Sequence, residues 1–429
     1  MREMKNSGIS WINEIPENWN VEPIKYNYSL IAGATPESTN VDFWDGDIKW
    51  VTPADFKTKD IFVTGGSRNL TAEGYKSCST SMLPIGSIVF SKRAPIGTVA
   101  ITADRLCTNQ GCLGLVEKSG RVLNKFYFYV ISIYGDVFNL FGSGTTFKEI
   151  SANTFANIKL PTPPIQEQKR IVDFLNAKCA EINSLTADIQ TQIDTLEQYK
   201  RSVITEAVTK GLNPDVEMKD SGTPWCPLIP IHWKYVNPKA LFTQRLDRAY
   251  PGDKQLTASQ EYGVIYQDEY MELTGTKIVT VMKDFSILKH VEPNDFVISM
   301  RSFQGGLEYS ERRGSISSAY VMLIPNNEYV YPPFYRWFFK SSKYINAIQS
   351  TSNLVRDGQA MRYANFAQVP LFIIPLDEQK QISEYLDEKV RKIDEILKSK
   401  KSQLEILAEY KKSLIYEYVT GKKEVPENA

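Results

Sequence analysis

Basic residues set among small and hydroxyl-bearing residues are the part of this sequence best suited to contact another molecule. Lys92 and Arg93 follow a serine, and a second arginine, Arg301, stands 208 positions after Arg93. Hydroxyl groups and backbone amides in such loops suit phosphate oxygens, whereas guanidinium, ammonium and amide groups suit base edges. We therefore expect a nucleic-acid interface at the following residues: Lys92, Arg93, Thr145, Thr146, Lys148, Arg301, Arg356 and Arg362.

Catalytic chemistry has weaker support. The chain has two histidines, His232 and His290, which are too few for a usual metal cluster. The segment 214–219 has the Pro-Asp and Glu-x-Lys parts of a metal-dependent nuclease site, but they are adjacent in a linker. Tyr331-Pro332-Pro333-Phe334 has tyrosine where a DNA adenine methyltransferase needs Asn or Asp, and no phosphate-binding G-x-x-x-x-G-K-[ST] loop is present. We expect no catalytic residue and no metal site.

The elements that must position the basic residues occur twice. The segment 6–19, with its Trp-x-x-x-Ile-Pro-x-x-Trp pattern, returns 214 positions later at 220–233. The segment 164–202, which runs from Pro-Ile-Gln-Glu-Gln-Lys to Tyr-Lys-Arg-Ser, returns in similar form 211 positions later at 375–413. The chain is thus a duplicated unit in which a globular segment is followed by a long helix.

Composition limits the class of protein. A chain of 429 residues and 48.8 kDa suggests two or three domains. Fifty Lys and Arg balance fifty Asp and Glu, so any face that binds a polyanion must be local. Five cysteines without a C-x-x-C pair indicate reduced thiols, and no segment has the pattern of a signal peptide or a membrane span. We expect a soluble, cytoplasmic protein.

The repeat predicts two α+β modules, at residues 1–160 and 214–375. Short β-branched runs such as 88–90 indicate buried strands, and the aromatic-rich segment 125–141 indicates a helix on the sheet. Each module ends in a proline-rich strap, after which a helix can start. Long helical regions are expected at residues 161–213 and 376–425, each about 65 Å long at ~1.5 Å per residue.

Heptad spacing in these regions predicts coiled-coil seams. One row recurs every seven residues. A partner row follows it by three positions, at Ile171, Leu185 and Tyr199 in the first helix and at Ile382, Ile396 and Tyr410 in the second. The residues that we expect in the seam or in subunit docking are Leu175, Ile182, Ile189, Leu196, Tyr199, Leu386, Ile393, Leu407 and Tyr410.

Four of these features, taken together, resemble the specificity subunit of type I restriction-modification systems. They are the Trp-x-x-x-Ile-Pro-x-x-Trp opening, the Gly-Thr-Thr-x-Lys loop at 144–148, the Leu-Pro-x-Pro-Pro-x-x-Glu-Gln strap at 160–168, and the Tyr-Lys-x-Ser close at 199–202. As an ordered set, most of which occurs twice, they cover essentially the whole chain. The second copy has Ser350 to Arg356 in place of the Gly-Thr-Thr-Lys loop, so the second module is expected to read a different sequence.

The resemblance implies two target-recognition domains that read the halves of a split double-stranded DNA sequence. They would be separated by two long antiparallel coiled-coil helices with pseudo-twofold internal symmetry. The helices would set the gap between the half-sites and dock two modification subunits, which bind S-adenosylmethionine and methylate adenine. A restriction subunit that uses ATP and Mg would join them, and this chain would hold no cofactor. Two alternatives stay open: a self-contained DNA adenine methyltransferase and a structural coiled-coil adaptor.

Overall fold

The computed structural model describes residues 2–57, 60–93, 95–144, 148–278, 285–299, 302–351 and 361–426. The chain divides into two compact units, Met1–Ile189 with Ser402–Ala429, and Gln190–Lys401. Each unit combines one globular module with a stretch of both long helices. We call the part before the first long helix the first module, and the part between the two long helices the second module.

The first module is built on a five-stranded sheet in the order β4-β11-β8-β9-β6. Its strands are β4 (Tyr28–Ala32), β11 (Cys112–Glu117), β8 (Ile88–Ser91), β9 (Val99–Thr102) and β6 (Phe62–Val63). The side chains of β8 alternate between two cores, because successive residues of a strand point to opposite faces. Ile88 and Phe90 join the larger core, and Val89 joins a smaller core on the other face.

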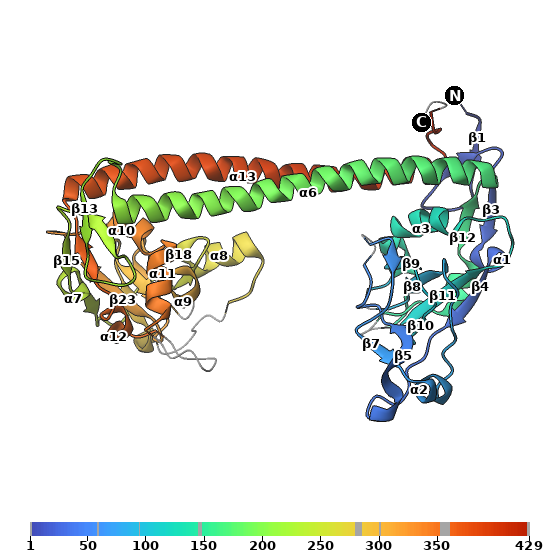
Figure 1. Ribbon diagram of the computed structural model, residues 1–429, viewed down its shortest axis with the longest axis horizontal. Helices are drawn as coiled ribbons and strands as arrows, with labels where there is room; N and C mark the ends of the chain where they lie inside the picture. The colour runs from blue at the N-terminus through green and yellow to red at the C-terminus, as the bar shows by residue number, and fades with distance from the viewer. Residues whose placement is uncertain are drawn as a thin grey trace. The chain divides into compact units, whose positions relative to one another are not determined.

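The aromatic-rich segment 125–141 forms two helices rather than the predicted single helix, α3 (Asn124–Ser132) and α4 (Gly135–Leu140). Helix α3 lies between the sheet and the start of α6 (Ile165–Lys210; Figure 1), and residues 126–131 are all buried, which agrees with their apolar character. The other elements of the first module are β1 (Met4–Asn6), β2 (Glu14–Pro16), β3 (Asn20–Pro23), α1 (Ile24–Asn27), η1 (Val41–Phe43), β5 (Trp44–Val51), β7 (Arg68–Leu70), α2 (Ala72–Ser77), β10 (Cys107–Thr108), α5 (Ala152–Asn157) and β12 (Lys159–Thr162).

The second module repeats the central part of this sheet. Its strands β16 (Phe242–Arg245), β23 (Val321–Pro325), β20 (Phe296–Ile298) and β21 (Glu308–Tyr309) form a sheet in that order. Phe296 pairs with Leu323, as Ile88 pairs with Leu115 in the first module, and both residues are displaced by 208 positions. β20 and β23 are therefore the counterparts of β8 and β11.

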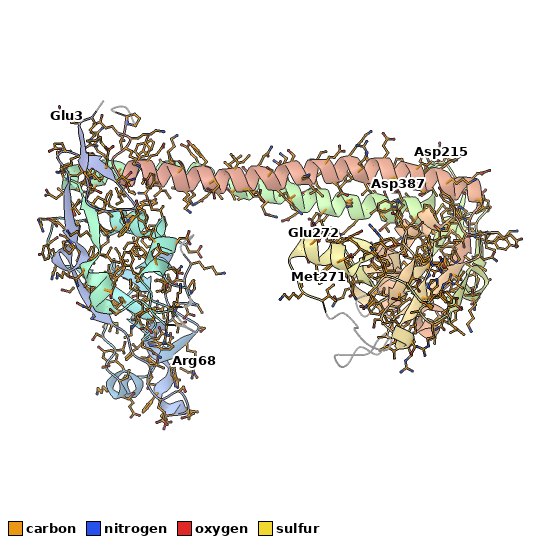
Figure 2. All side chains as sticks on the ribbon, turned by 180° about the vertical axis from the view of Figure 1, so that it is seen from behind. Glu3, Arg68, Asp215, Met271, Glu272 and Asp387 are labelled. Carbon is orange, nitrogen blue, oxygen red and sulfur yellow. The ribbon has the colours of Figure 1, made fainter. Side chains whose placement is uncertain are left out.

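The two modules differ around these shared strands. The first has a small sheet in the order β10-β5-β7, and Arg68 of β7 lies at the end of this module away from the helices (Figure 2). The second has separate strand pairs, β17 with β18 and β19 with β22. Its other elements are β13 (Met218–Asp220), β14 (Leu228–Pro230), β15 (Lys234–Val236), α7 (Pro238–Leu241), β17 (Leu256–Ser259), β18 (Gly263–Tyr266), α8 (Gln267–Thr274), η2 (Phe285–Ile287), β19 (Lys289–Val291), α9 (Ser302–Gly305), β22 (Gly314–Ile316), α10 (Pro332–Phe338), α11 (Ser342–Gln349), α12 (Tyr363–Phe366) and β24 (Leu371–Ile373).

The long helices are α6 (Ile165–Lys210) and α13 (Leu376–Val419). In the first unit Lys411 donates a hydrogen bond to Asn183 at 2.7 Å, and in the second unit Lys200 donates one to Asp394 at 2.6 Å. Both partners differ by 211 positions between the two contacts, so the contacts are equivalent in the two copies. Within each unit the two helical stretches run antiparallel, which confirms the predicted coiled coil. Among the described residues, no helix is long and apolar enough to cross a bilayer.

The predicted partner row of the seam is wrong at four of its six positions, although Ile171 and Ile382 are buried. The exposed fractions of Leu185, Tyr199, Ile396 and Tyr410 are 48, 47, 46 and 54%. The row that packs inward lies four positions after the first row rather than three, as shown by the burial of Cys179, Ile193, Val390 and Leu397. A heptad allows either spacing. The small residues Cys179 and Ala207 occupy the true row of α6, whereas larger apolar residues lie beside it, so side-chain size misled the prediction.

The prediction of the first row of the seam agrees better with the observed burial. Its buried members are Leu175, Ile182, Ile189, Leu386 and Ile393, and its half-buried members are Leu196 and Leu407.

A repeated junction attaches each module to the helices. The indole Nε1–H of Trp19 donates to Glu167 at the start of α6 at 2.9 Å, and that of Trp233 donates to Glu378 at the start of α13 at 3.0 Å. The next residue, Gln168 or Gln379, is fully buried in both copies. Its amide nitrogen donates to two backbone carbonyls, and its Oε1 accepts from the backbone N–H of Leu123 or Tyr331 at 2.8 Å.

The end of the opposite helix completes each junction. Gly421, after α13, has φ +72°, and a Cβ added there would lie 2.4 Å from Pro16. Gly211, after α6, has φ +76°, and a Cβ there would lie 2.9 Å from Glu378. Both positions need glycine for its left-handed conformation and its lack of a side chain. The repeated tryptophan, Glu-Gln and glycine residues are thus a frame that positions the modules.

A second contact fixes the second module to α13. The indole Nε1–H of Trp337 donates to Asp387 at 2.7 Å, and Arg336 pairs with the same carboxylate. Figure 2 labels Asp387 on the helix.

Candidate nucleic-acid interface

Lys92 and Arg93 directly follow β8, next to the loop that leads from α4 to α5. The backbone N–H of Lys92 donates to Gly111 at 2.9 Å, and the Lys92 carbonyl accepts from Ile150 at 3.0 Å. The end of the strand is therefore held between two loops, which fixes where both side chains leave the backbone.

Glu149 distinguishes the two cations. Lys92 Nζ lies 2.6 Å from its carboxylate, and the Lys92 side chain is 16% exposed. Arg93 Nη1 is 3.9 Å from the same carboxylate, and its side chain is 35% exposed. Lys92 is thus neutralised inside the protein, whereas the Arg93 guanidinium keeps donors that another molecule could use.

Lys148 lies on the loop that pairs with this strand end. It precedes Glu149, its side chain is exposed, and Glu149 forms a backbone pair with Ser143 through two 3.0 Å hydrogen bonds. The structure therefore places the backbone of Lys148 near Lys92 and Arg93, although the two segments are far apart in the sequence. Thr145 and Thr146 lie outside the described residues.

A neighbouring turn was missed in the sequence analysis. Residues 109–111 connect β10 to β11, and a Cβ added at Gly111 would lie 3.1 Å from Arg93 Nε. Gln110 has an exposed side chain whose Oε1 accepts a hydrogen bond from Thr35. An Asn-Gln-Gly sequence between two β-rich runs is a turn signal, so the turn could have been predicted. Its place beside Arg93 depends on the fold.

Three of the expected DNA-binding residues belong to the second module. Arg301 and Arg356 lie outside the described residues. Arg362 has an exposed side chain at the start of α12, and its backbone N–H donates to Asn365 at 3.0 Å. The DNA contacts expected of Arg301, Arg356 and Arg362 stay predictions.

The residues considered for catalysis have structural partners. His290 is fully buried, and its ring nitrogens lie 2.7 Å from Asp253 and from Glu292. His232 lies 2.7 Å from Glu378 in the second junction. The segment Tyr331 to Phe334 opens α10, and its first N–H is bound by Gln379. The described residues include no group of three His, Cys, Asp or Glu arranged to hold a metal ion.

Comparisons with known proteins agree with this architecture. Residues 16–195 match the family model of the type I restriction modification DNA specificity domain. The chain is 34% identical over 168 residues to the type I restriction enzyme MjaIX specificity subunit of Methanocaldococcus jannaschii, covering 38% of this chain and 39% of that protein. It is 26% identical over 179 residues to the EcoR124I/EcoR124II specificity subunit of Escherichia coli, covering 39% and 43%. The alignments thus span less than half the length of these relatives.

The fold likeness extends further along the chain. A solved structure of a type I restriction-modification system matches with a TM-score of 0.70 at 14% identity and covers 95% of this chain and 99% of its own. The HsdS subunit from Thermoanaerobacter tengcongensis matches with a TM-score of 0.50 at 14% identity, over 95% and 98%. At this identity the likeness shows the fold alone.

The resemblance seen in the sequence is therefore confirmed. Residues 16–195 match the type I restriction modification DNA specificity domain, and the curated relatives that the chain resembles are specificity subunits of type I restriction enzymes. Its fold is the predicted one, with two α+β modules and two long helices.

Proposed function

We propose that this chain is the non-catalytic addressing subunit of a type I restriction-modification enzyme. Each module would read one half of a split DNA target, and partner subunits would perform methylation and cleavage with their own S-adenosylmethionine, ATP and Mg. The observation that carries this proposal is a duplicated frame with two different modules. The Trp19–Glu167 and Trp233–Glu378 junctions have the same geometry, whereas the strands around the shared sheet differ.

The experiment is to express the full chain with methyltransferase subunits of its own system and to map N6-methyladenine across the host genome. A split motif with a fixed gap is the expected result. Methylation by the purified chain alone would instead favour a self-contained methyltransferase. A chain that assembles with its partners but selects no DNA sequence would favour the structural adaptor.

The surface of the helices suggests where two identical partners dock. Leu185 and Tyr410 each follow a seam residue by three positions, in the antiparallel stretch of the first unit. They therefore lie on the same flank of the seam. Tyr199 and Ile396 repeat this arrangement in the second unit, 211 positions from Tyr410 and Leu185, and all four are about half exposed. Two equivalent apolar pairs suit two copies of one partner.

Replacement of one pair tests this part of the proposal. Leu185→Glu with Tyr410→Glu should reduce the stoichiometry from two methyltransferase subunits per chain to one, as measured by native mass spectrometry. The matched control is Ser184→Glu, an exposed position on the far side of α6. If the double variant still binds two subunits, the docking surface lies elsewhere on the chain.

A further inference from the structure

The turn between β10 and β11 has a counterpart in the second module. Because Ile88–Leu115 corresponds to Phe296–Leu323, residues 109–112 correspond to 317–320. In both turns the last N–H donates to the first carbonyl at 3.1 Å, from Cys112 to Asn109 and from Tyr320 to Ser317. The backbone of this turn is therefore the same in the two copies.

The first side chain of each turn has the same internal role. The N–H of Gly111 donates to Asn109 Oδ1 at 2.9 Å, and the N–H of Ala319 donates to Ser317 Oγ at 3.3 Å. Asn109 and Ser317 both close the turn, as such short polar side chains commonly do. These two residues are thus used by the protein itself.

The second side chain of each turn is exposed and differs in chemistry. It is Gln110 in the first module and Ser318 in the second. Each turn leads into a central strand, since β11 lies between β4 and β8 and β23 lies between β16 and β20. A side chain on a short turn next to a central strand is held more rigidly than one on a long loop.

The surroundings of Gln110 fit base recognition. Arg93 lies against Gly111, where a Cβ would be 3.1 Å from its Nε, from Asn109 Oδ1 and from Pro53 Cγ. Thr35 donates to the Gln110 carbonyl oxygen, which orients the amide. A guanidinium and an amide then project from neighbouring loops. Arginine typically binds guanine, and glutamine typically binds adenine through its paired donor and acceptor.

We propose that Gln110 and Ser318 are equivalent specificity-determining residues, one in each module. Gln110, beside Arg93, selects adenine at one position of the first half-site. Ser318 occupies the same place toward the second half-site and discriminates less, because a single hydroxyl can pair with several base edges. This inference rests on the proposed function, since it assumes that both modules read duplex DNA.

The test maps N6-methyladenine in cells that express the full chain, as wild type or variant, with its methyltransferase subunits. Gln110→Ala and Gln110→Ser should lower the preference at one position of the first half-site at least about fivefold and leave the second half-site unchanged. Ser318→Gln should add a preference for adenine to the second half-site only. Gln166→Ala, at an exposed amide at the start of α6, is the matched control.

The outcomes separate this inference from the proposed function. No split motif in the wild type would mean that the proposed function has failed. A wild-type split motif that stays the same in both Gln110 variants would overturn the inference alone. Equal loss of methylation at every site would also overturn it, because that result indicates weaker binding rather than altered reading. Unchanged melting temperatures would show that the variants fold.

Discussion

Among the single residues, Arg93 and Lys92 are neighbours with different expected roles. Arg93→Ala should weaken binding of target DNA by about 1–3 kcal/mol if the guanidinium reads a base. Lys92→Ala should act mainly on stability, because it leaves the half-buried Glu149 carboxylate without its 2.6 Å partner. Fluorescence anisotropy with the assembled methyltransferase measures the first effect, and denaturant unfolding measures the second. Equal effects of both variants on DNA affinity would contradict this division.

The cysteines give a second prediction at the residue scale. Burial raises the pKa of the Cys107 and Cys226 thiols to about 11, so at pH 8 only about one molecule in a thousand carries either thiolate. Cys78 is half-exposed. We expect a thiol reagent to modify Cys78 first in the folded protein and the buried thiols only after unfolding. Mass spectrometry of the labelled peptides checks the order, and Cys78→Ser should abolish the fast phase.

At the scale of the elements, the start of each long helix depends on one buried side-chain amide, that of Gln168 in α6 and that of Gln379 in α13. Gln168→Met should destabilise the first unit by at least about 1–3 kcal/mol, because it leaves the Leu123 N–H and two carbonyls without partners. Gln379→Met should do the same in the second unit. The control is Gln166→Met on the exposed side of the same turn, and urea unfolding followed for each unit separately is the measurement. If the variant loses no more unfolding free energy than the control, water must take over the hydrogen bonds of the amide.

The sequence predicts elements better than it predicts which side chains meet. Duplication, proline straps and heptads were enough for two α+β modules and two long helices, because these signals are local. The prediction of the seam was wrong at Leu185 and Tyr199, because the size of a side chain does not show which flank of a helix packs against its partner. The cluster around Glu149 could not be predicted either, since residues 92 and 149 meet only through the pairing of loops across the fold. Their role in DNA binding stays a prediction.

At the scale of the whole molecule, the residues of the repeated frame are more constrained in sequence than the residues of the two modules. The junction residues recur because each helix start and each helix end must meet the same surface. The Lys200–Asp394 and Lys411–Asn183 contacts recur because the two helices pack against each other in the same way in both units. The turn residues Gln110 and Ser318 do not take part in these contacts between modules and helices. A duplicated chain can therefore change what one module reads without loss of the frame, and the modules should be exchangeable between relatives at the straps.

The length of the helices should set the gap between the two half-sites. Adding one heptad between residues 191 and 192 and another between 402 and 403 lengthens both helices by about 10.5 Å at ~1.5 Å per residue and keeps the seam in phase. Because DNA rises ~3.4 Å per base pair, the methylated motif should keep both half-sites and gain about three base pairs between them. A heptad in one helix alone mismatches the antiparallel pair and should abolish methylation. An unchanged gap in the double insertion would show that the helices do not measure the target.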